Sequence, residues 1–443
     1  MQTPIVDFIK KYARKKTARF HMPGHKGKKV FLGEKFDITE IDGADNLSAP
    51  FGIIKNSQDN TAKLFGAEKT YFSTAGSSLS IKAMLSAFIK NNGERPVVFA
   101  GRNAHKAFIH SAILLDFEIK WLYGEDRESY LSCQISPEYL ERVLSSNDKP
   151  TAVYITSPDY LGNIADIKGL NKVCSKFNVP LLVDNAHGAY LKFLSSDIHP
   201  ITLGATACVD SAHKTLPVLT GGGYLHFSST AKKFIDIKKV QNNISLFSSS
   251  SPSYLIMASL DNANKILDSD FSEKLNKTVK KVLEVKNKLI NFGVTIKNSE
   301  PLKIVIDAKK CGYTAFELNE LLLKNGVVVE FYDEDYLTLM VTPFNKKSDY
   351  KKLIKAFKNF TPKKEIEKVN LSFNAEKVLS PKQAYLLDKE RVKVEDANGK
   401  ILADISYSCP PAVPIAIIGE RIDSEIINAL KYYKVEQVEV IKE

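Results

Sequence analysis

Two residues that follow strand-like segments could together carry out amine chemistry. Lys214 follows the apolar run ATACV in the segment DSAHK, and a lysine at a strand end could form an imine with a carbonyl group. Asp184 ends the apolar run VPLLVD thirty residues earlier, where a buried carboxylate is costly unless it is paired. A lysine imine and an aspartate on a pyridinium nitrogen are the combination that holds pyridoxal 5'-phosphate (PLP). Taken singly, a solvated lysine and a structural ion pair are the commoner interpretations.

Two further segments offer groups for the phosphate and the ring of such a cofactor. In STAGSSLSIKAMLSAF, the residues Gly76, Ser77 and Ser78 precede a helical apolar pattern. A helix N-terminus with free N–H groups suits a dianionic phosphate, although ordinary helix capping explains the same residues. His105 follows the run PVVFAGRNA and offers a flat ring that could stack on a pyridine. The sequence contains no Walker lysine pattern, which argues against a nucleotide P-loop.

Strand-like and helix-like segments alternate through the middle of the chain. The short apolar runs are PVVFAGR (96–102), TAVYITSP (151–158), VPLLVDNAHG (179–188), ATACVDSAHK (205–214) and GGYLHF (222–227). Helical periodicity covers 79–91 and 137–144 between them. This alternation predicts an α/β fold with a mostly parallel sheet covered on both faces, and functional groups at the strand ends.

The chain changes in character after about residue 255. One or two lysine-rich helices over 260–291 precede four strand-like runs, which are VTIKN, LKIVIDA, VVVEFYD and YLTLMVTP. A last segment holds VKVEDANGK, SYSCPPAVPIAIIGERI and a terminal helix. We therefore predict four parts: an N-terminal segment with a short amphipathic helix (1–50), a large cofactor-binding domain (51–265), a small α/β domain (266–368) and a C-terminal domain (369–443).

Charge and cysteine content limit the possible partners and compartments. The 443 residues carry 62 Lys and Arg against 51 Asp and Glu, a net charge of +11 that favours an anionic partner. The excess lies in 1–35, with ten basic and two acidic residues, and in 346–368, with nine and three. Five widely spaced cysteines without a CxxC pair argue against disulfides or a metal site. With no signal peptide and no long apolar run, we expect a cytoplasmic protein outside the membrane.

Six motifs in one order closely resemble the Orn/Lys/Arg decarboxylase family of fold type I PLP enzymes, in its short bacterial form without a wing domain. The motifs are HMPGHKG, SQDNTAKLFGAEKTYFSTAGSS, RNAHKAFIHSA, TSPDYLGNIADI, LLVDNAHGAYL and DSAHKTLPVLTGG. The resemblance covers nearly the whole chain. It implies a large domain with a mostly parallel seven-stranded sheet, a smaller α/β domain and a C-terminal domain. It also implies decarboxylation of a basic amino acid, with arginine favoured over lysine and ornithine, to feed polyamine synthesis. The active form would be a homodimer or a higher oligomer that needs no nucleic acid.

The resemblance assigns roles at the cofactor site position by position. Lys214 would bind the cofactor covalently, and His213 would lie near the reacting carbon, so that either could return a proton to it. Asp184 would bind the pyridine nitrogen. The other cofactor-binding candidates are Gly76, Ser77, Ser78 and Ser211 at the phosphate, His105 stacked on the ring, and Ala186 and His187 packed nearby.

A basic substrate requires an acid for its distal cation, and the resemblance places Glu330 of NGVVVEFYDEDY there. His25 in HMPGHKG is a second candidate for substrate binding. Asp333, Glu334 and Asp335 are less specific acids, and a solvated turn is the simpler interpretation of them.

Several positions depart from the family pattern. Asn185 and Tyr190 replace a glutamate and a histidine of DEAHGAH, Asp159 stands where threonine or asparagine is usual, and STAGSSLS differs from NGTTSG. These departures leave the substrate open. They also leave two alternatives, which are a different fold type I enzyme such as an aminotransferase or lyase, and a non-catalytic basic protein that binds nucleic acid.

Overall fold

The computed structural model describes residues 1–15, 17–90, 93–125, 129–369, 374–404 and 412–442. The chain divides into two compact units. The first unit comprises Met1–Asn92, Val143–Ile155 and Asp166–Leu275, and the second comprises Gly93–Arg142, Thr156–Ala165 and Asn276–Glu443. The four-part division expected from the sequence stays a prediction. No helix of the described part is long and apolar enough to cross a membrane.

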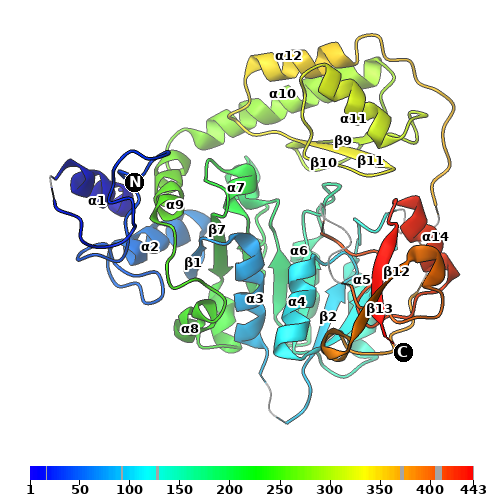
Figure 1. Cartoon of the computed structure of the whole chain (residues 1–443), viewed down its shortest axis with the longest axis horizontal. Helices are drawn as coiled ribbons and strands as arrows, with labels where there is room; N and C mark the ends of the chain where they lie inside the picture. Colours follow the sequence, from blue (N-terminus) through cyan, green and yellow to red (C-terminus); the bar gives the residue numbers. More distant parts are fainter. Residues whose placement is uncertain (16, 91–92, 126–128, 370–373, 405–411, 443) are drawn as a thin grey trace. The chain divides into compact units, whose positions relative to one another are not determined.

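The largest sheet has seven strands in the order β1-β7-β6-β5-β4-β2-β3 (Figure 1). They are β1 (Lys69–Ser73), β2 (Val97–Gly101), β3 (Glu118–Leu122), β4 (Ala152–Thr156), β5 (Leu181–Asp184), β6 (Ala207–Asp210) and β7 (Gly223–Phe227). β5 pairs in parallel with β6 and β2 with β3, whereas β7 runs antiparallel to β6 and β1. The seven-stranded sheet and its five predicted runs are confirmed. β1 and β3 were not predicted, because charged residues such as Lys69 and Lys120 interrupt their apolar pattern.

The helices of the first unit include those predicted near the N-terminus, over 79–91 and at the start of 260–291, and others that the sequence did not predict. They are α1 (Pro4–Arg14), α2 (Ile53–Phe65), α3 (Gly76–Phe88), α6 (Ile167–Lys176), α7 (Ala212–Thr215), α8 (Val240–Ser245) and α9 (Tyr254–Leu267). α1 buries Ile5 and Ile9 on one face, as an amphipathic helix should. α3 packs on β6 and β7, which brings its N-terminus to the strand ends that carry the candidate chemistry.

The second unit holds a four-stranded antiparallel sheet in the order β10-β11-β9-β8. Its strands are β8 (Ile296–Lys297), β9 (Lys303–Asp307), β10 (Phe331–Tyr332) and β11 (Tyr336–Met340). The helices α11 (Ala315–Lys324) and α12 (Lys347–Ala356) follow β9 and β11, and α10 (Phe271–Asn291) leads into this unit from the first. The predicted strand VVVEFYD is shorter than expected, because only its Phe331–Tyr332 part pairs with β11.

The C-terminal part of the second unit has its own apolar core. It contains α13 (Pro381–Leu386), β12 (Lys389–Lys393), α14 (Ser424–Tyr432) and β13 (Gln437–Ile441), and β12 pairs antiparallel with β13. Leu402, Ile422, Ile426 and Val440 are buried together there. The predicted terminal helix is confirmed, but the strand after it was missed. Within the segment SYSCPPAVPIAIIGERI, residues 406–411 lie outside the described residues.

Candidate active site

Lys214 and His187 meet at the ends of two neighbouring strands. Lys214 lies on the short helix α7, which follows β6 directly, and His187 lies in the loop after β5. Nζ of Lys214 is 2.9 Å from Nε2 of His187. β5 and β6 pair in parallel, so their carboxyl ends open at the same edge of the sheet. The fold therefore brings together two segments that the sequence singled out separately.

Asp184 is the last residue of β5, and only 2% of its surface is exposed. Its Oδ2 accepts a hydrogen bond of 3.1 Å from the Tyr154 hydroxyl, and its Oδ1 accepts one of 3.2 Å from the Ala186 N–H. Burial raises the pKa of Asp184 above its ordinary value, while the charge of Lys214 and these hydrogen bonds oppose that rise. A buried carboxylate held in this way suits a cationic partner such as a protonated pyridine nitrogen.

Tyr154 is a contributor that the sequence did not reveal. It lies on β4 and is fully buried, and its only signal was an aromatic hydroxyl within the run TAVYITSP. The alternation of side chains along a strand does not show which residues of the neighbouring strand lie beside it. The contact with Asp184 therefore could not be predicted.

A cradle for a phosphate forms at the N-terminus of α3. The Ser211 hydroxyl donates a 2.8 Å hydrogen bond to the Ser77 hydroxyl, which joins the loop after β6 to this helix end. Gly76 has φ of +67°, a conformation that favours glycine. A side chain on Gly223 would place its Cβ 3.4 Å from the Ser77 nitrogen and crowd the cradle. Ser78 lies in the same first turn, so small residues, hydroxyls and helix N–H groups fit a phosphate.

The remaining candidate histidines are held by their own local contacts. His213 Nδ1 lies 2.8 Å from the Gly222 carbonyl oxygen, which orients the ring beside Lys214 in the chain. His105 is the N-cap of α4 (Lys106–Leu115) and accepts a hydrogen bond from the Ala107 N–H, so its stacking on a ring stays a prediction. His25 Nε2 lies 3.3 Å from a carboxylate oxygen of Asp37, and its role in substrate binding also stays a prediction.

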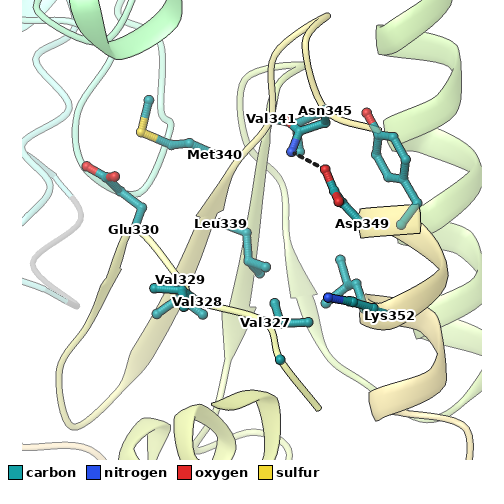
Figure 2. Close-up of a pocket in the computed structure, with 13 residues that line it drawn as sticks. Val327, Val328, Val329, Glu330, Leu339, Met340, Val341, Asn345, Asp349 and Lys352 are labelled. Carbon is teal, nitrogen blue, oxygen red and sulfur yellow. Dashed lines mark hydrogen bonds between the residues drawn. The ribbon is translucent and has the colours of Figure 1, made fainter. Parts of the chain in front are cut away.

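Glu330 lies at a bend that leads into β10 and is exposed. It borders a pocket of about 320 Å³ in the second unit, beside Met340 at the end of β11 (Figure 2). Aliphatic side chains such as Val329 and Leu339 line the pocket near it. On the opposite side, Asp349 is already committed to capping α12, where it accepts the Lys346 N–H. Glu330 thus lies at the edge of a hollow of mixed polarity, which Asn345 and Lys352 also line.

The acids next to Glu330 are not a solvated turn, and that interpretation was wrong. Asp333, Glu334 and Asp335 are all less than a tenth exposed. Tyr432 and Tyr433 of the C-terminal part donate hydroxyl hydrogen bonds to Asp335. Burial, together with the charges of Asp335 and Glu334, raises the pKa of Asp333 to about 7, although two backbone N–H groups donate hydrogen bonds to it. Its Oδ2 has no hydrogen-bond partner among the described residues. These acids therefore belong to the interior of the second unit.

Comparison with known proteins decides the family. The family model described as "Orn/Lys/Arg decarboxylase, major domain" matches residues 3–306. The chain belongs to the Orn/Lys/Arg decarboxylase family. It is 28% identical to an arginine decarboxylase of Bacillus subtilis, over 96% of this chain and 92% of that protein. A lysine decarboxylase of Pseudomonas aeruginosa is 22% identical over 61% of this chain and 41% of its own length.

Solved structures show the same fold. The lysine decarboxylase of Francisella novicida superposes with a TM-score of 0.83 at 17% identity, covering 99% of this chain and 81% of that one. A NifS-like protein superposes with a TM-score of 0.57 over 71% of this chain. The chain is thus a PLP-dependent decarboxylase of basic amino acids, built on the fold type I architecture. This sets aside the expected alternatives of an aminotransferase and a nucleic-acid-binding protein.

Proposed function

We propose that this decarboxylase acts on arginine and that its amine product feeds polyamine synthesis. The observation that carries the proposal is the near full-length similarity to an arginine decarboxylase. The lysine and ornithine decarboxylases of Pseudomonas aeruginosa and Haemophilus influenzae align with only 61% and 69% of the chain. Lysine and ornithine remain the alternative substrates.

The described side chains support specific roles toward PLP. Lys214 would attach the cofactor, and Asp184 would hold its ring nitrogen in the protonated form. Gly76, with the Ser77, Ser78 and Ser211 hydroxyls, would receive the phosphate. Ala186 and His187 would pack beside them, and His105 would stack on the ring. Bound PLP supplies an acceptor for the electron pair released when carbon dioxide leaves.

Proton return to the substrate carbon requires a donor that is fixed and close to the lysine. His213 meets the first requirement, because its Nδ1 contacts the Gly222 carbonyl oxygen and its Nε2 can then face outward. Lys214 is the other candidate donor. Glu330 would bind the distal cation of the substrate through a charge-assisted hydrogen bond, and His25 would make a second contact with the substrate.

The proposed form of the enzyme is a cytoplasmic homodimer. Large apolar side chains are exposed along the N-terminal segment, among them Phe20, Val30, Phe31 and Leu32. Such a patch on a soluble chain suits an interface with a second copy. Four of the five cysteines are free and buried in the described part, which fits a reducing compartment.

The test is release of carbon dioxide from arginine, lysine and ornithine, each offered separately to PLP-loaded protein. We expect arginine to give the highest kcat/KM. Lys214→Ala is the control that should release none. Higher kcat/KM with lysine or ornithine would overturn the arginine assignment, and no release from any of the three would overturn the proposed function as a whole.

A further inference from the structure

A second buried carboxylate lies beside Asp184, on the next strand. Asp210 is the last residue of β6 and is completely buried. The Asn185 amide Nδ2 donates a 2.6 Å hydrogen bond to its Oδ1. His199 Nε2 and His226 Nε2 lie 3.1 Å and 3.3 Å from its Oδ2. One buried anion is thus hydrogen-bonded by Asn185 and His199 from the segment after β5, and His226 Nε2 of β7 lies close to it without hydrogen-bond geometry.

A neutral imidazole can provide the hydrogen bond from His199. The Ile201 N–H donates to His199 Nδ1, which leaves the proton of that ring on Nε2, facing Asp210. The Thr70 hydroxyl lies 2.8 Å from His226 Nδ1 and can serve the second ring in the same way. Burial acts to raise the pKa of Asp210, but His199 and His226 hold it well below its ordinary value. Asp210 is therefore a fixed negative charge.

The same atoms could be read as a metal site. His199, Cys208 and Asp210 bring potential ligand atoms within 4.8 Å of one another. Both oxygens of Asp210 already accept hydrogen bonds, however, and these contacts account for the cluster through the protein's own groups. The cluster is better described as a pocket built around one carboxylate.

The position of this carboxylate gives it significance for the cofactor. Asn185 directly follows Asp184, and Asp210 directly precedes Ser211 and the Lys214 helix. Their hydrogen bond therefore ties the strand end that carries the ring-nitrogen acid to the strand end that carries the lysine. Asn185 is also the position where the family pattern has glutamate. A glutamate there would place a second carboxylate against Asp210.

We propose that Asn185 and Asp210 form a matched positioning pair that fixes Asp184 relative to the Lys214 helix. The proposal rests on the proposed function, since it gives the pair a role at the PLP site. The pair explains why asparagine replaces the family's glutamate at position 185. An amide is needed there because Asp210 of β6 already supplies the carboxylate. Neither residue touches substrate in this role, and both act through Asp184 and Lys214.

The test exchanges the two groups. Asn185→Asp alone sets two carboxylates against each other across a 2.6 Å contact. In the double variant Asn185→Asp/Asp210→Asn, the new amide can donate to residue 185 while its oxygen still accepts from His199. The exposed Asn242→Asp is the matched control for the same chemical change. The groups that face the pair and could titrate with it are Asp184, Lys214, His199, His226, Cys208 and Tyr224.

The readouts are the PLP dissociation constant of the apoenzyme, the Tm of the apoenzyme, and the pH at which the visible band of bound PLP titrates. We expect Asn185→Asp to weaken PLP binding ~10-fold and move that pH by about one unit, since interacting carboxylates titrate together. In the double variant, the PLP dissociation constant should return to within ~3-fold of wild type, and the titration pH to within a few tenths of a unit. Asn242→Asp should change neither.

Three results would overturn the pair. They are wild-type PLP binding in Asn185→Asp, a double variant no better than that single variant, and stoichiometric metal in the purified wild type. If Asn185→Asp does not yield folded protein, recovery of folded, PLP-binding protein in the double variant supports the pair and its failure refutes it. Because PLP binding needs no substrate, these results are independent of which amino acid is decarboxylated.

Discussion

The cofactor side of the decarboxylase and its proposed substrate acid differ in how firmly their side chains are held. Asp184 is buried, and both of its oxygens accept hydrogen bonds. Glu330 is exposed at a bend. Its backbone N–H donates a hydrogen bond to the Thr338 carbonyl oxygen, and among the described residues no hydrogen bond to its carboxylate is found. The first residue is oriented before any ligand arrives, and the second can adjust to the ligand that it meets.

This difference fits the two tasks. A cofactor ring nitrogen needs a permanent charge at one place, and a low-dielectric surrounding strengthens its effect. A substrate must enter and leave, so its distal cation is better met by a group that stays solvated until binding. Loss of a buried group should therefore lower the activity toward all substrates equally. Loss of Glu330 should lower the activity toward basic substrates selectively.

The sharpest test on the cofactor side is Lys214→Ala. Without the amine, PLP cannot be held covalently, and we expect decarboxylation of every basic amino acid to fall by ~10³-fold or more. In this variant, borohydride reduction should not attach the cofactor irreversibly to the protein. Lys192→Ala, at a partly buried lysine that pairs with Asp197, is the control and should keep both properties. A covalently attached cofactor in Lys214→Ala would contradict the assignment.

On the substrate side, Glu330→Gln should raise KM for the basic substrate by ~10-fold, which corresponds to about 1.4 kcal/mol. PLP affinity should not change. Glu320→Gln, at an exposed glutamate of α11, is the matched control and should leave KM unchanged. If Glu330→Gln instead weakens PLP binding and leaves KM unchanged, Glu330 serves the cofactor and the proposed difference between the two regions is wrong.

The placement of candidate residues was easiest to predict where they come directly at a strand end, although their roles toward the cofactor stay predictions. Lys214, Asp184 and His187 each end or follow an apolar run, and parallel strands deliver such ends to one edge. Ser77 was singled out as a small hydroxyl residue before a helix, whereas Ser211 was assigned by the resemblance to the family. The structure joins the two by a hydrogen bond of 2.8 Å. Their hydrogen bond joins two segments that lie far apart in the chain.

Sequence reasoning failed where burial depends on tertiary contacts. The acids Asp333 and Asp335 look like a solvated turn, but Tyr432 and Tyr433 cover Asp335 from nearly one hundred residues away. Tyr154 and the imidazoles around Asp210 also look like ordinary core residues in the sequence. Their roles depend on strand register, which a single sequence does not specify.

Tyr154→Phe measures how much the preset orientation of Asp184 matters. It removes one hydrogen bond to a charged group, and we expect PLP affinity to fall by ~5-fold, or about 1 kcal/mol. Tyr71→Phe is a matched control, since that buried hydroxyl donates to the Ile237 carbonyl oxygen away from Asp184. Both variants should lose some stability. Equal PLP affinities in the two variants would show that Tyr154 serves packing alone.

An effect on stability alone, with no effect on catalysis, is expected at the acids near Glu330. Since burial raises the folded-state pKa of Asp333 to about 7, the folded protein holds this proton more tightly than the unfolded chain. This group therefore costs stability as the pH rises from about 4 to about 7. Asp333→Asn removes that cost, and we expect its gain over wild type to be ~4 kcal/mol larger at pH 8 than at pH 4 in urea unfolding.

The opposite sign is expected at an exposed acid of the same unit. The Lys346 N–H holds the pKa of Asp349 below its ordinary value, so this carboxylate adds stability that is lost as the pH falls through that lowered pKa. Asp349→Asn should therefore be less stable than wild type at pH 8, and the difference should shrink towards acid pH. If both variants show the same pH trend, burial does not distinguish Asp333 from a surface acid, and the interior placement of residues 333–335 would be refuted.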